Sequence, residues 1–209
     1  MAFTLAQAIT EVRALLNEDT ASYWSDTNIT SWIQQGCLDF TEKSLLLVCK
    51  DTITLATGVS QYSTSGSSYI SDAMRTIHAE YNNKALQRIT FENIRGHNAR
   101  TLGSVTTPTY YFDLYNGTTF NLYIGPTPTA TENGTAVTVY FACKTNDITK
   151  IPWEYQPSIF LFAAYKAKMR ERLYQEAHLY YQQYINNITF ARQDGLVRGV
   201  QDLGAFRIQ

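Results

Sequence analysis

The chain has 209 residues, of which 44% are hydrophobic and 17% are charged, and its formal net charge is −1. This length fits one domain, or one domain with an elaborate insertion. The absence of a basic excess argues against a dedicated DNA-binding protein, because nucleic-acid phosphates require positive charge on the protein.

The first predicted helix begins at Thr4. Thr4 and Gln7 form a capping-box signature, in which Ser or Thr is followed three residues later by Glu or Gln. Apolar residues then recur at helical spacing from Leu5 to Leu16, and the pattern ends at residues 17–19.

A second helix is predicted to begin near Ser25 and Asp26, which provide an N-cap and a carboxylate in the first turn. Its apolar stripe runs from Ile29 to Val48 and passes Gly36. A glycine inside a helix costs about 1 kcal/mol relative to alanine. We therefore expect another helix to pack closely at that point.

Residues 51–150 are predicted to form a β-rich insertion, because strand-like runs alternate there with turn residues. A hairpin is expected to turn at Asn82 and Asn83, and residues 91–100 have room for one helical turn. The predicted strands span residues 52–55, 59–63, 74–81, 85–89, 110–115, 119–124 and 136–144.

The strongest hairpin signal joins residues 110–115 to 119–124 through Asn116 and Gly117. Because a slip of one residue exchanges the two faces of a strand, the loop length decides the pairing. A three-residue loop pairs apolar residues with one another, so we predict that loop. The predicted pairs are Leu114 with Phe120 and Phe112 with Leu122.

The last helical block contains no Gly or Pro between Ser158 and Asp194. It is either one long helix or two helices broken near Arg172. From Gly195 onward, three glycines and spaced apolar residues predict an extended tail that docks on a partner.

These elements together predict an α+β fold, with N- and C-terminal helices in a bundle, an inserted region of antiparallel β-hairpins and an extended C-terminal tail. The expected parts are the N-terminal helices at 1–50, the insertion at 51–150, the C-terminal helices at 151–192 and the arm at 193–209.

No catalytic, cofactor-binding or metal-binding constellation is found in the sequence. Phosphate-binding, dinucleotide-binding and nucleophile-elbow motifs are absent. His78, His97 and His178 lie far apart, and none has metal-ligand spacing. Asp113 is a glycosidase candidate only if a second carboxylate lies nearby, and none is suggested. We therefore expect no enzyme.

Three cysteines, Cys37, Cys49 and Cys143, are too few and too widely spaced for a disulfide framework or a zinc site. We expect them to be small buried residues in a reducing compartment. The N-terminus lacks signal-peptide character, and no stretch approaches the length of a transmembrane helix. We therefore expect a soluble protein made in the cytoplasm.

Two groups of residues are candidates for a subunit interface or a channel surface. The first is a cluster of four cations, in which like charges lie four residues apart and repel each other. Glu171 and Glu176 can relieve this repulsion within the chain, or carboxylates of a neighbouring chain or passing DNA can relieve it from outside. The second is a set of tyrosines, because tyrosine is enriched at interfaces, although core packing explains them nearly as well. The candidates are Lys166, Lys168, Arg170, Arg172, Tyr180, Tyr181 and Tyr184.

A series of short segments carries a further signal through its order and spacing. The segments are the opening helix, Trp24-Ser25-Asp26 before Ile29 and Trp32-Ile33, Pro108-Thr109-Tyr110-Tyr111, Leu122 to Gly125-Pro126-Thr127-Pro128, a strand ending near Tyr140, Ile151-Pro152, and a helix with Ala163-Ala164-Tyr165 and a Tyr-rich second half. In this order they resemble the head-to-tail adaptor (connector) proteins of short-tailed and related tailed bacteriophages, over roughly residues 4–187.

The resemblance implies a ring beneath the portal protein, typically of twelve copies, that extends the DNA channel toward the tail. The implied partners are the portal protein, the tail or nozzle protein, other copies of the chain, and double-stranded DNA passing without sequence-specific binding. The implied location is the virion neck, after synthesis in the host cytoplasm, and neither a cofactor nor a membrane is implied.

Members of that family often bind the portal through a C-terminal arm. The resemblance therefore implies that residues 195–209 bind the portal. The family has no catalytic residues to carry over. The candidate portal-binding residues are Leu196, Val197, Arg198, Val200, Leu203, Phe206, Arg207 and Ile208.

Three other functions stay open. Another neck or tail-completion component has the same composition but a different copy number and no contact with the portal. A carbohydrate-binding module that uses exposed Tyr and Trp on the β-region works as a monomer and needs no long flanking helices. A cell-wall hydrolase requires a polar constellation that the sequence does not present.

Overall fold

Two units make up the chain in this computed structural model, which describes residues 2–18, 23–63, 73–90, 107–116 and 119–205. The first, which we call the helical unit, comprises Met1–Leu47 and Lys144–Gln209. The second, the β unit, comprises Val48–Cys143 and is inserted between the two parts of the helical unit. The fold is α+β, as the sequence predicts.

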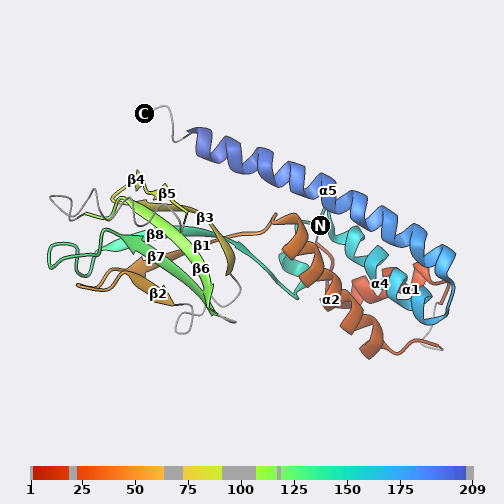
Figure 1. Ribbon diagram of the computed structural model, residues 1–209. Helices are drawn as coiled ribbons and strands as arrows, with labels where there is room; N and C mark the ends of the chain where they lie inside the picture. The colour runs from red at the N-terminus through yellow and green to blue at the C-terminus, as the bar shows by residue number, and fades with distance from the viewer. Residues whose placement is uncertain (1, 19–22, 64–72, 91–106, 117–118, 206–209) are drawn as a thin grey trace. The chain divides into compact units, whose positions relative to one another are not determined.

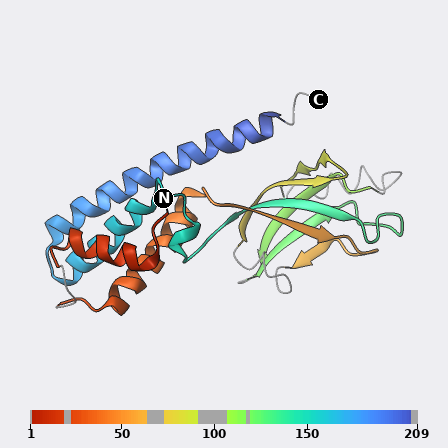
Figure 2. The same cartoon turned by 180° about the vertical axis from the view of Figure 1, so that it is seen from behind.

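The helical unit joins the two ends of the chain in one core. α4 packs against α1, α2 and α5 and is therefore its central helix (Figures 1 and 2). The elements are α1 (Leu5–Leu15), α2 (Asp26–Ser44), the short 3-10 helix η3 (Ile148–Lys150), α4 (Gln156–Arg170) and α5 (Tyr174–Ala205).

Local capping explains where α1 and α2 begin. The predicted capping box is present: the Gln7 amide donates to Thr4 Oγ1 at 3.3 Å, and the Thr4 amide donates to Gln7 Oε1 at 2.9 Å. Ser25 caps α2, as predicted. α2 ends at Ser44, before the end of its predicted stripe, because Leu45 adopts a left-handed φ of 54°.

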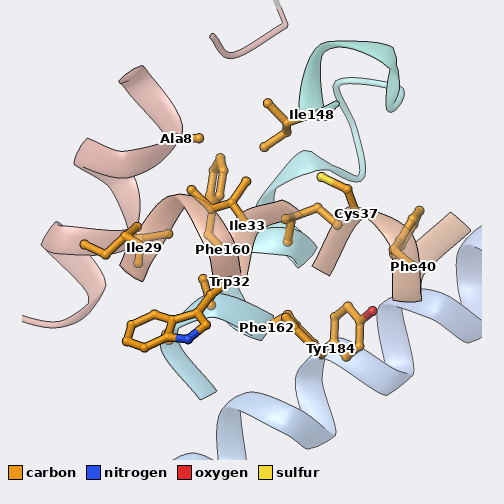
Figure 3. Close-up of a cluster of buried hydrophobic side chains, with 14 of the residues drawn as sticks. Ala8, Ile29, Trp32, Ile33, Cys37, Phe40, Ile148, Phe160, Phe162 and Tyr184 are labelled. Atoms are coloured by element: carbon orange, nitrogen blue, oxygen red, sulfur yellow. The ribbon is translucent and has the colours of Figure 1, made fainter. Parts of the chain in front are cut away.

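Gly36 lies where α2 crosses α4. A Cβ atom at this position would be 3.0 Å from Cδ1 of Phe162 and 3.1 Å from Cγ2 of Ile159. The predicted close helix packing at Gly36 is therefore confirmed. Figure 3 shows the surrounding cluster, in which Trp32 of α2, Phe162 of α4 and Tyr184 of α5 lie together.

The last helical block is two helices, broken at Arg172 as one of the two predicted alternatives has it. Arg172 adopts a left-handed φ of 63°, and α5 begins at Tyr174. The Leu173 amide donates to the Lys168 carbonyl at 3.0 Å, which satisfies a carbonyl at the end of α4.

The prediction of an extended tail from residue 193 onward is wrong for residues 193–205, because α5 continues as a helix to Ala205. Each of its glycines costs about 1 kcal/mol relative to alanine. Adding residues to an existing helix needs no new nucleus, however, so the helix propagates through them. Figure 1 shows α5 continuing past the ends of α2 and α4. Residues 206–209 lie outside the described part of the chain.

Within its described residues, the β unit consists of two four-stranded sheets, with orders β1-β8-β3-β4 and β2-β7-β6-β5. β3 and β4 pair about Asn82 and Asn83, as predicted, and both asparagines have positive φ. Val137, Val139 and Phe141 are buried on one face of β8. The strands are β1 (Val48–Thr54), β2 (Gln61–Ser63), β3 (Ala73–Tyr81), β4 (Lys84–Ala85), β5 (Gln87–Arg88), β6 (Tyr110–Asn116), β7 (Thr119–Gly125) and β8 (Ala136–Cys143).

The single strand predicted at residues 85–89 is divided between the two sheets. The Leu86 amide donates to the Ala79 carbonyl at 2.8 Å, in the sheet that contains β3. The Gln87 amide donates to the Thr109 carbonyl at 2.9 Å, next to β6 of the other sheet. Since the partner changes between consecutive residues, side-chain alternation alone does not reveal the division.

The hairpin of β6 and β7 is present, but the predicted register is wrong by one residue. Both faces of β6 carry aromatic rings, so its own alternation does not decide the register. Tyr111 reaches the other sheet, where its hydroxyl donates to the Ile77 carbonyl at 3.1 Å. The observed pairs are Phe112 with Tyr123 and Leu114 with Asn121.

Candidate functional site

The described residues contain no group of three or more His, Cys, Asp and Glu side chains placed to hold a metal ion. His78 Nε2 lies 2.9 Å from Glu80 Oε1, and His178 is hydrogen-bonded to Gln182. His97 lies outside the described residues. The histidines in the described segments are thus paired with neighbours on their own element.

Asp113 is tied into the β unit by both carboxylate oxygens. Arg88 Nη2 donates to Oδ1 at 2.8 Å, and the Thr76 amide donates to Oδ2 at 3.1 Å. These bonds connect β6 to β5 and β3. The carboxylate therefore links the two sheets, which is a structural role.

Cys37 and Cys143 are buried, as predicted, whereas Cys49 is partly exposed. All three thiols are free. Burial, followed by the nearby Asp147 carboxylate, raises the pKa of Cys37 from 9.0 to about 12. This cysteine therefore stays a neutral thiol at ordinary pH and is a poor nucleophile.

Lys168 is a partly buried member of the cation cluster. Its Nζ lies 3.2 Å from Glu171 Oε2 and 3.3 Å from Glu176 Oε2. Desolvation opposes the charged form, but the hydrogen bonds to these two carboxylates raise the pKa of Lys168. The two glutamates named from the sequence are thus its partners within the chain.

The other cations of the cluster point in different directions. Lys166 Nζ lies 5.2 Å from the centroid of the Phe162 ring, and the Arg170 guanidinium lies 5.1 Å from that of Trp32. Both distances fit cation–π contacts. Arg172 occupies the turn between α4 and α5. The four cations therefore do not converge on one site.

The three tyrosines proposed for an interface pack within the helical unit to different degrees. Tyr184 is 0% exposed, and its hydroxyl donates to Asp39 Oδ2 at 2.7 Å. The hydroxyl of the half-buried Tyr180 donates to the Leu15 carbonyl at 3.2 Å. The half-buried Tyr181 lies against Tyr184, with 6.2 Å between ring centroids. Tyr184 is therefore part of the core.

The candidate portal-binding residues up to Leu203 lie on the last turns of α5. Phe206, Arg207 and Ile208 lie outside the described residues. Among the α5 residues whose side chains the structure describes, Asp194 and Gly195 contact the rest of the helical unit. Asp194 Oδ2 accepts a hydrogen bond from the Tyr155 hydroxyl at 2.9 Å, and a Cβ atom on Gly195 would be 3.2 Å from Cδ1 of Leu46.

A long, uncharged strip of α5, which we call the α5 outer face, is exposed. Leu179 is 60% exposed and Phe190 is 63% exposed. They are eleven residues apart, and therefore lie on the same side of the helix. Arg192 lies two residues beyond Phe190 and so points to the other side. The α5 outer face consists of Leu179, Gln182, Gln183, Asn186, Phe190 and Gln193.

A second exposed strip without charge lies on α2, and we call it the α2 outer face. Leu38 is 37% exposed at its C-terminal end, and Gln35 Nε2 donates to Ser31 Oγ at 3.2 Å. Neither face was predicted from the sequence, although in each the uncharged residues recur at helical spacing opposite the apolar stripe. The α2 outer face consists of Thr27, Ser31, Gln34, Gln35 and Leu38.

Comparison with known families gives one finding for almost the whole chain. Residues 3–201 match the model of the family described as SU10 adaptor protein. No match is found among curated proteins. Among the described helices, none is both long enough and apolar enough to cross a membrane.

Proposed function

Because the chain belongs to the SU10 adaptor protein family, and so is a structural, non-enzymatic component of a phage virion neck, we propose that it is a subunit of the head-to-tail adaptor ring. This ring docks on the portal, connects the capsid to the tail and extends the DNA channel. The family match, which spans residues 3–201, is the observation that carries the proposal.

The partners follow from the position of such a ring. The chain associates with further copies of itself, in twelve copies if the ring matches the portal. Portal protein lies on one side of the ring and a tail or nozzle protein on the other. Double-stranded DNA passes through the channel without sequence-specific binding, and the net charge of −1 supports a surface that does not hold DNA.

The C-terminal part of the chain, residues 193–209, is proposed as the portal contact. Its shape differs from the extended arm expected from the sequence, because α5 is helical as far as Ala205. A helix that runs past its own packing partners can lay one side on a groove of another protein. The contact residues proposed are Leu196, Val197, Arg198, Val200, Leu203, Phe206, Arg207 and Ile208.

Size-resolved mass analysis of the purified protein, alone and mixed with its cognate portal, tests this proposal. A complex with one ring of subunits per portal supports it. A monomer that does not bind the portal contradicts it. That result would favour another neck or tail-completion component, or a carbohydrate-binding β module, and glycan binding by the isolated protein separates these two.

A further inference from the structure

The two uncharged outer faces point to a protein partner. DNA binding requires Lys and Arg at the surface, and helices that lie on membranes usually carry Lys or Arg beside their apolar face. None of the six residues of the α5 outer face is Lys or Arg, and Leu179 and Phe190 are both at least 60% exposed. Exposed apolar side chains without neighbouring charge are typical of the central part of a protein interface.

The partner must also lack charge where it meets this face, because burying a charge without a partner is costly. The helical unit itself presents such a surface on α2. Both faces combine apolar side chains with glutamine, whose amide group offers a donor and an acceptor. Two charged residues beside them have partners: Asp39 pairs with Lys43 at 2.8 Å, and Glu176 with Lys168. Glu42, one turn beyond Leu38, is exposed and marks the end of the α2 outer face.

We propose that the α5 outer face of one copy docks on the α2 outer face of the next copy. The two faces are different surfaces of one subunit, so the contact is heterologous and repeats from copy to copy, as a ring requires. This inference rests on the proposed adaptor ring and names the surfaces that build it.

The small area of the two faces predicts that ring assembly needs a template. From Leu179 to Gln193 the α5 outer face is about 21 Å long, and a helix is about 10–12 Å wide. The contact therefore covers on the order of 250 Å² per partner, well below the ~800 Å² of a standard stable interface. Two free copies are expected to separate, whereas neighbours held side by side on a portal form the contact repeatedly.

Engineered disulfides test the contact directly. One variant carries Asn186→Cys on the α5 outer face, and another carries Gln35→Cys on the α2 outer face. A control variant carries Thr10→Cys on the exposed side of α1. Every variant also carries Cys49→Ser, because Cys49 is partly exposed. Mixtures are oxidised both as concentrated protein and after addition of the portal, and dimers are read on a denaturing gel.

The expected result is a covalent dimer from the mixture of Asn186→Cys and Gln35→Cys, with only background dimer from either variant alone. Mixing Asn186→Cys with Thr10→Cys is expected to give background dimer. A dimer from Asn186→Cys alone, or one that prefers Thr10→Cys, overturns the proposal.

The mass of the portal complex separates this inference from the proposed function. A ring that assembles on the portal without the 35–186 cross-link contradicts the contact and leaves the adaptor role standing. If no ring forms, the adaptor role fails. The contact is then judged on the concentrated protein, where the absence of the cross-link overturns it and its presence supports it.

Discussion

Gly36 is the residue on which the packing of α2 against α4 most directly depends. Gly36→Ala gains about 1 kcal/mol of helix propensity, but overpacking a core typically costs about 1–3 kcal/mol. Phe162 is 6% exposed and Ile159 is 0% exposed, so neither has room to move aside. We expect the free energy of unfolding to fall by about 1 kcal/mol in urea titrations. An increase would contradict the packing, and Ser31→Ala on the exposed side of α2 is the matched control.

The buried Cys37 thiol makes the free energy of unfolding depend on pH in the alkaline range. Its folded-state pKa is raised from 9.0 to about 12, first by burial and then by Asp147. Because the raised pKa belongs to the folded state, the stabilisation is complete below pH 9.0 and is lost as the pH rises toward about 12. We expect Cys37→Ala to reduce the slope of stability against pH by up to about 1.4 kcal/mol per unit.

Urea titrations across this pH range measure the slope, which is informative even though the smaller side chain also lowers absolute stability. Ser31→Ala, which removes no titratable group, is the control and should leave the slope unchanged. An unchanged slope in Cys37→Ala would show that the thiol does not titrate in this range.

At the scale of elements, the connection between α1 and α2 is held by a buried ionic network. Arg13, which is 7% exposed, donates through Nη2 to the Trp24 carbonyl at 2.8 Å and to Asp26 Oδ1 at 2.6 Å. Its Nη1 lies 3.2 Å from Glu18 Oε2, and Glu18 Oε1 accepts from the Trp24 amide at 3.0 Å. One arginine therefore anchors both ends of the connection.

Removing one partner of a buried ion pair leaves an uncompensated charge, which typically costs about 3–5 kcal/mol. We expect Arg13→Leu to lower the free energy of unfolding by about 3 kcal/mol, near the lower end of this range. The double variant Arg13→Leu/Glu18→Leu should lose less than the sum of the two single variants. Additive losses would show that the two charges do not interact. Asp26→Ala, whose carboxylate is 68% exposed, should cost less than about 1 kcal/mol.

The C-terminal part of α5 is proposed to contact the portal, whereas the earlier part of the helix packs in the helical unit. Deleting residues 195–209 retains the hydrogen bond between Tyr155 and Asp194. We therefore expect the shortened protein to keep its fold, seen as an unchanged far-UV spectrum per residue apart from the lost helical turns, and to lose portal binding. Unchanged affinity for the portal would contradict the proposed contact.

At the scale of the whole molecule, assembly is expected to wait for the portal. The free protein should be a monomer at micromolar concentration, because ring closure on a template prevents premature polymerisation. Sedimentation analysis over a concentration series measures this. A stable dodecamer of the isolated protein would contradict the prediction.

Patterns in the sequence were enough to predict the ends of α1, the start of α2, the close packing at Gly36 and the order of helical and β segments. The caps and the turn depend on residues that are near one another in the chain, such as the Thr4–Gln7 capping box or the turn at Asn82. The packing at Gly36 was predicted from the local cost of a glycine within a helix, although its partners Ile159 and Phe162 are distant in sequence. The resemblance to phage adaptors was also evident from the sequence, and the family match confirms it.

Tertiary structure alone decided the features in which distant groups compete. The Tyr111 hydroxyl donates to the Ile77 carbonyl of the other sheet, so Tyr111 lies on the face of β6 that points toward that sheet. This contact decides a hairpin register that side-chain alternation within β6 leaves open. Residues 85–89 are divided between two sheets because Ala79 and Thr109 offer their carbonyls to adjacent amides. The α5 helix continues through three glycines because it extends a helix already packed on α4. A local sequence pattern shows which secondary structures a segment favours, whereas contacts with distant segments determine which of these structures forms.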